Sequence, residues 1–109
     1  MNSVGIATAC MNRELNLIKA IPSWLKSGAD KIHIIDWSSE LNLQDFIQDK
    51  LGVNPKVKFF RINNKNKWIL THAFNLALSS LDTNFIAKFD CDHICKKNFF
   101  KEIDLRKGI

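Results

Sequence analysis

Short apolar runs alternate with amphipathic segments along this chain. The runs at 4–9, 31–36, 56–62 and 85–90 have the length and composition of β-strands. The first is largely apolar, as in a strand covered on both faces, whereas the third alternates and predicts one less buried face. The pattern therefore predicts four strands.

Three segments between these strands have helical spacing, at 13–26, 41–50 and 67–81. The signal is strongest in the third, where one face carries Leu70, Ala73, Phe74, Ala77 and Leu81. The order βαβαβαβ predicts an α/β fold with a mostly parallel sheet of about four strands and flanking helices. In such folds ligands bind at the carboxyl ends of the strands.

The first helix also carries end and break signals. Asn12 is expected to cap it, and Leu15, Ile18 and Leu25 are expected on one apolar side. Pro22 removes a backbone donor, so we expect either two short helices or one bent one.

Composition fits one globular domain over residues 1–109, with 46% apolar and 25% charged residues. The net charge of +5 is compatible with an anionic ligand. Three cysteines without a C-x-x-C pair argue against a disulfide framework and favour a reducing compartment. No apolar stretch approaches the roughly 20 residues of a bilayer span, and no leader precedes Val4. We expect a cytoplasmic protein that could reach a membrane surface through a partner.

Asp90 and Asp92 stand two residues apart where the fourth strand is expected to end. In an extended chain this spacing directs both carboxylates to one side, with Cys91 facing the other. Paired carboxylates suit a hard divalent cation, which can also take phosphate oxygens. The alternative is a pair of solvated turn aspartates.

Asp36 ends the second strand in the same way and is followed by Trp37. Its carboxylate could accept the imide N–H of uracil, although a turn or cap aspartate is the commoner role for such a residue. Trp37 could pack on a base or lie in the core. On the third helix, Asn75 shares a face with three other residues, Trp68, His72 and Ser79, and that face is available to a ligand.

Two other phosphate or metal sites are weighed against this one. The loop at 8–13 has no glycine, so neither a dinucleotide-binding turn nor a P-loop is present. Cys91, His93 and Cys95 could hold zinc, but three ligands on one extended segment do not readily close a tetrahedron.

With these pieces in order, the chain resembles the N-terminal half of a family-2 glycosyltransferase of the GT-A fold, whose first part is Rossmann-like. The resemblance runs through V-G-I-A-T-A-C-M-N-R-E, P-S-W-L, I-H-I-I-D-W-S-S, W-I-L-T-H-A-F-N-L-A-L and F-I-A-K-F-D-C-D. It implies a nucleotide-diphosphate sugar donor, expected to be UDP-linked, a glycan or other hydroxyl acceptor, and Mn²⁺ or Mg²⁺.

The same resemblance implies roles for single residues. Thr8 is placed in the nucleotide loop and Asp36 at the base. Asn75 is placed on the nucleotide side, Asp90 at the ribose and metal, and Asp92 on the metal.

The sequence departs from the family pattern at two positions and in its length. Phe74 stands where many members have arginine, and Ser38 where a glycine is common. The family's catalytic carboxylate lies well beyond the D-x-D motif, and only 17 residues follow Asp92, so no catalytic base is named. A non-catalytic nucleotide-binding module is the alternative function. A nucleic-acid binder would rest on net charge alone, and we expect no nucleic-acid partner.

Overall fold

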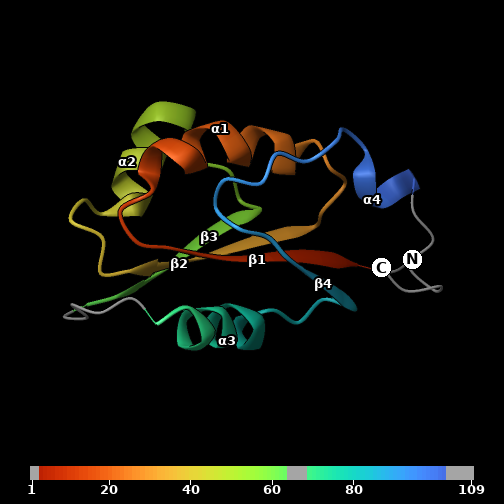
Figure 1. Cartoon of the computed structure of the whole chain (residues 1–109). Helices are drawn as coiled ribbons and strands as arrows, with labels where there is room; N and C mark the ends of the chain where they lie inside the picture. The colour runs from red at the N-terminus through yellow and green to blue at the C-terminus, as the bar shows by residue number, and fades with distance from the viewer. Residues whose placement is uncertain (1–2, 64–68, 103–109) are drawn as a thin grey trace.

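A computed structural model describes residues 3–63 and 69–102, which form an α/β domain (Figure 1). Its strands are β1 (Val4–Cys10), β2 (Lys31–Trp37), β3 (Val57–Ile62) and β4 (Phe85–Lys88), and its helices are α1 (Glu14–Leu25), α2 (Leu43–Leu51), α3 (Leu70–Ser80) and α4 (Phe99–Glu102). The strands form one parallel sheet in the order β3-β2-β1-β4. The predicted fold class is confirmed.

The sheet is covered on both faces, with α1 and α2 on one side and α3 on the other (Figure 1). Successive residues of β1 point to opposite faces, so Ile6 and Cys10 pack beneath α1 and α2 while Ala7 and Ala9 face α3. All seven residues of β1 are buried, as its largely apolar sequence predicts. The edge strand β3 alternates in exposure, which confirms its less buried face.

Helix α1 differs from its prediction in the face that it buries. The core side carries Leu17, Ala20, Ile21 and Trp24, whereas Leu15 is 68% exposed. Both sets of apolar residues have helical spacing, and the larger set around Trp24 removes more apolar surface from water. Pro22 lies inside a helix that continues to Leu25, so of the two predicted alternatives the split into two short helices does not occur.

The capping prediction for Asn12 is also wrong. Asn12 adopts a positive φ of 58°, and Arg13 stands at the N-cap without a side-chain hydrogen bond. The Asn12 carboxamide oxygen instead accepts from the Glu40 N–H at 2.7 Å, and its own N–H donates to Ser39 Oγ at 3.0 Å. The loop after β1 is therefore attached to the loop after β2.

The ends of α3 and β4 lie inside their predicted bounds. Helix α3 begins at Leu70 rather than at position 67, and residues 64–68 lie outside the described part of the chain. Strand β4 ends at Lys88, although the Phe89 N–H still donates to the Ala7 carbonyl at 3.0 Å. In the described residues no helix is long and apolar enough to cross a membrane.

Candidate functional site

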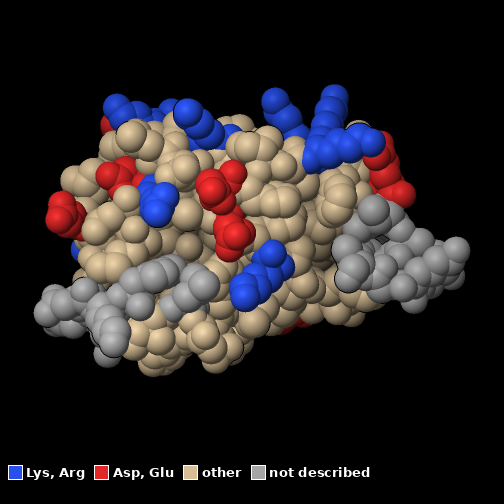
Figure 2. Space-filling model, viewed as in Figure 1, with Lys and Arg blue, Asp and Glu red and all other residues tan. Residues whose placement is uncertain are grey.

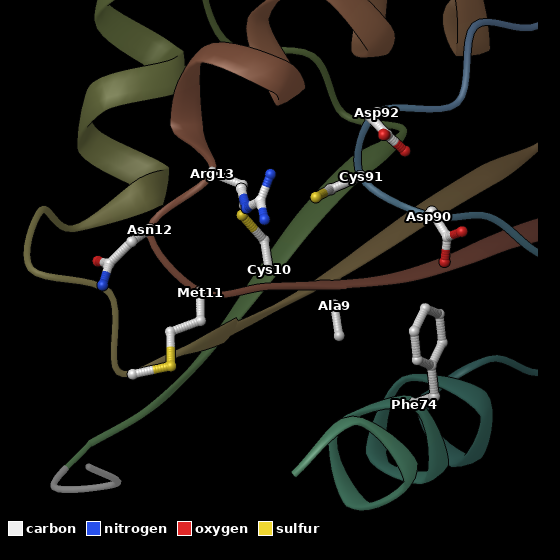
Figure 3. Close-up of a pocket in the computed structure, with 9 residues that line it drawn as sticks. All are labelled: Ala9, Cys10, Met11, Asn12, Arg13, Phe74, Asp90, Cys91 and Asp92. Atoms are coloured by element: carbon white, nitrogen blue, oxygen red, sulfur yellow. The ribbon is translucent and has the colours of Figure 1, made fainter. Parts of the chain in front are cut away.

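A pocket of about 430 Å³ opens at the carboxyl ends of β1 and β4 (Figure 3). Its lining comes from three places, the end of β1 with the loop that follows, the loop after β4, and α3. The lining residues are Ala9, Cys10, Met11, Asn12, Arg13, Phe74, Asp90, Cys91 and Asp92. This is the edge of the sheet where a parallel α/β fold is expected to bind its ligand.

The wall from the β1 loop is held in place by Asn12. Its left-handed backbone turns the chain sharply between β1 and α1, and its two hydrogen bonds fix that turn against residues 39 and 40. Arg13, the next residue, is exposed, and its guanidinium lies beside the pocket (Figure 3). A cation is therefore present on the side of the pocket opposite the loop after β4.

Asp90, Cys91 and Asp92 lie in a turn rather than in a strand, because the His93 N–H donates to the Asp90 carbonyl at 3.0 Å. The expected extended geometry is therefore wrong. Both carboxylates are exposed and line the pocket, but they leave the loop in different directions, with Asp90 toward Phe74 (Figure 3). Figure 2 shows acidic side chains near the centre of this face with basic ones on either side.

The end of this turn is anchored on the core. The indole N–H of Trp24 donates to the His93 carbonyl at 2.8 Å, and the His93 ring stacks on Phe89 at 4.3 Å between centroids. Trp24 is completely buried, so its N–H needs a partner and the loop supplies it. The position of the two aspartates therefore depends on packing against α1.

Between the two walls, the thiols of Cys10 and Cys91 interact. Their hydrogen bond raises the pKa of the Cys10 thiol, with burial as the second cause. The same hydrogen bond lowers the pKa of the Cys91 thiol, against the opposing effects of burial and of Asp92.

Phe74 forms the wall on the α3 side, at the position where arginine is common in the resembled family. The Lys88 ammonium lies 4.5 Å from the centroid of this ring. A positive charge is therefore present next to Phe74, although it is carried by β4 rather than by the helix.

Asp36 is only 1% exposed, and its carboxylate is used within the fold. It accepts the N–H groups of Ser39 and Leu43, each at 3.1 Å, and forms an ion pair with Arg61. These contacts fit the turn-and-cap role that was weighed against base binding. Asp36 does not line the pocket.

The other predicted contacts are also placed away from the pocket lining. Thr8 is fully buried in β1, where its hydroxyl has no hydrogen-bond partner among the residues that the structure describes. Asn75 is exposed on α3 but does not line the pocket. Trp37 lies in the core with an edge contact to His72 at 5.4 Å, and Trp68 is outside the described residues.

The zinc alternative is not assembled in the structure. Cys91 faces Cys10, and Cys95 is buried with its backbone N–H donating to Ser23 Oγ at 2.9 Å. Across residues 3–63 and 69–102, no group of three or more His, Cys, Asp or Glu side chains is arranged to hold a metal ion. Arg13 is the pocket residue that sequence reasoning missed, although its place directly after a buried strand was a signal for it.

No protein-family profile and no curated protein matches this chain. Solved structures do match, among them residues 1–349 of TarS from S. aureus, a family-2-like glycosyltransferase of the GT-A type, with a TM-score of 0.72 and 18% identity. The chain has a glycosyltransferase-like fold. The match covers 92% of this chain and 30% of the TarS chain, so this sequence spans under a third of that structure.

Proposed function

We propose that this chain is the donor-binding part of a metal-dependent glycosyltransferase of family 2, with Asp90 and Asp92 as the ligands of Mn²⁺ or Mg²⁺. The single observation that carries the proposal is the pocket at the carboxyl ends of β1 and β4, which both carboxylates and Arg13 line. The donor would be a nucleotide-diphosphate sugar, UDP-linked by resemblance, and the acceptor a hydroxyl of a glycan or another molecule.

The two carboxylates are suitable ligands for such a cation. Asp90 and Asp92 supply oxygen ligands, and both are exposed to the pocket. Mg²⁺ and similar hard cations are commonly held by one or two carboxylates, with water and substrate phosphates in the other positions. When bound, the cation would act as a Lewis acid that neutralises the diphosphate leaving group.

The remaining lining residues have separate roles in this proposal. Arg13 donates to a phosphate oxygen through a charge-assisted hydrogen bond. Asn12 keeps the Arg13 loop in place, and Phe74 supplies an apolar wall that excludes water. The loop after β2 contributes to the site by holding Asn12, through the Glu40 N–H and the Ser39 hydroxyl. The base for the acceptor hydroxyl comes from outside this sequence.

Thermal unfolding with UDP and Mn²⁺ tests donor binding. A ligand that binds only the folded state raises the melting temperature, and we expect this rise to require both UDP and the metal. Asp92→Asn should abolish it, whereas Asp49→Asn, at an exposed position on α2, should leave it unchanged. A folded protein with no response to UDP and Mn²⁺ would contradict the proposal, as would an equal loss in both variants.

A transfer assay separates this function from a non-catalytic binding module. The isolated chain should bind UDP without transferring sugar, since no acceptor base is assigned within it. Transfer should appear when the chain is part of a longer enzyme. We further propose a cytoplasmic location, with membrane contact only through a partner protein.

A further inference from the structure

Two cysteine side chains from opposite walls of the pocket point toward each other (Figure 3). Cys10 ends β1, and Cys91 lies in the turn that carries the two aspartates. All three cysteines of the chain are free thiols, so this pair is reduced. Neither sulfur has a role in the donor binding proposed above.

The strand register explains why the two cysteines meet. Strands β1 and β4 pair in parallel, with Val4 opposite Phe85 and Ala7 opposite Lys88. The contact continues past the end of β4, because the Phe89 N–H still donates to the Ala7 carbonyl. This pairing brings the turn after β4 alongside the end of β1, where Cys10 lies. The two thiols are within hydrogen-bond reach of each other, so their sulfurs are close enough to be joined.

The two side chains also lie on the same face of the sheet. Cys10 belongs to the core beneath α1 and α2, and Cys91 packs against that core. Cys10 is 1% exposed, whereas Cys91 is half-buried and both line the pocket, so a small molecule in the pocket can reach the Cys91 sulfur. Cys95 lies apart, buried beside Ser23.

We propose that Cys10 and Cys91 form an oxidation site at which a small hydroperoxide produces an intramolecular disulfide across the pocket. The bond would tie the aspartate turn directly to the end of β1. In reducing compartments such disulfides are transient and respond to oxidants. The proposal does not depend on the nucleotide-sugar function.

The reaction balances with the peroxide as the oxidant. The Cys91 sulfur attacks one peroxide oxygen, the O–O bond breaks, and the thiol proton leaves with the departing oxygen as water. The resulting Cys91 sulfenic acid is attacked by the Cys10 sulfur. An S–S bond forms, the S–O bond breaks, and hydroxide takes the Cys10 proton to give a second water. Two thiols are oxidised by two electrons, and a dithiol reductant reverses the step.

Thiol counting on the full 109-residue chain tests the proposal with hydrogen peroxide as the probe. After brief treatment, labelling under denaturing conditions should fall from three thiols to one, with Cys95 still labelled, and dithiothreitol should restore all three. Trypsin should release a cross-linked pair of peptides, 1–13 and 89–96. Cleavage before Asp92 separates Cys91 from Cys95 and so identifies which of them is joined to Cys10.

Variants complete the test. Cys95→Ser should still form the disulfide, whereas Cys91→Ser should not, and circular dichroism checks that each variant is folded. Cys10→Ser alters a buried position, so the mapping of the unmodified chain remains the primary measurement. Three labelled thiols after peroxide treatment, a Cys91–Cys95 bond, or cross-links only between molecules would overturn the proposal.

Discussion

Arg61, near the end of β3, forms an ion pair with the buried carboxylate of Asp36 at the end of β2. The Asp36 side chain is 1% exposed and that of Arg61 30% exposed, so the pair sits at the boundary of the core. The same carboxylate accepts two backbone N–H groups at the start of α2 and the turn before it. Asp36 therefore joins β2, β3 and α2.

Replacing Asp36 should strongly destabilise the fold. In Asp36→Ala the N–H groups of Ser39 and Leu43 lose their acceptor, and the Arg61 guanidinium loses its charged partner while keeping its weaker neutral acceptors. Removing one partner of a buried ion pair costs about 3–5 kcal/mol. Urea denaturation of Asp36→Ala and of the exposed control Asp49→Ala measures the difference, and a loss below about 1 kcal/mol for Asp36→Ala would contradict this account.

Two substitutions of Asn12 separate its backbone role from its side-chain role. Asn12→Ala loses the acceptor for the Glu40 N–H and places at this positive φ a residue that adopts the left-handed region less readily than Asn, so we expect a loss of about 2 kcal/mol. Asn12→Gly keeps the backbone freedom and should lose about 1 kcal/mol. Chemical denaturation gives both values. Equal losses would mean that the positive φ carries no cost.

Arg13→Gln should weaken UDP binding without unfolding the chain. The guanidinium is exposed at the pocket, and a hydrogen bond to a charged group contributes about 1.5–3 kcal/mol, so we expect a loss of roughly tenfold or more in affinity. Calorimetric titration with UDP and Mn²⁺ measures it. Lys19→Gln, on the exposed side of α1, is the matched control and should bind as the unmodified chain does.

His33 should make stability fall at mildly acid pH. Burial, followed by the charges of Lys58 and Lys31, lowers the pKa of this imidazole below 6.5. The unfolded chain therefore takes up a proton at higher pH than the folded one, and stability decreases as pH falls from about 6.5 toward the folded pKa. Denaturation midpoints at pH 7.5 and 5.5 should differ less in His33→Gln, whereas His93→Gln, at an exposed histidine, should keep the full difference.

The strands and the parallel fold could be predicted because the short apolar runs have the length and composition of buried strands and alternate with helical segments. Val4 to Ala9 is apolar except for Thr8, and burial on both faces is what such a run favours. The buried face of α1 could not be chosen, since Leu15 with Ile18 and Leu17 with Ile21 are both separated by steps typical of a helix face, three and four residues. Only packing against β1 and α2 decides between them.

The candidate site was predicted as a location rather than as a geometry. The place of Asp90 and Asp92 beyond the fourth strand follows from strand order, but their turn depends on the Trp24–His93 hydrogen bond, which joins residues far apart in sequence. Likewise, the sequence left the Asp36 carboxylate available to a ligand, whereas in the fold this carboxylate forms an ion pair with Arg61, a residue of another strand. Local patterns carry no information on such contacts.

The hydrogen bond from Trp24 to the His93 carbonyl gives the protein its own optical probe. A completely buried indole on the core side of α1 is coupled to the turn that carries Asp92, so any ligand that moves this turn changes the surroundings of the fluorophore. Trp37 is buried on the other side of the sheet, in the cluster that packs against α3. Emission spectra can thus follow the pocket in real time without a label.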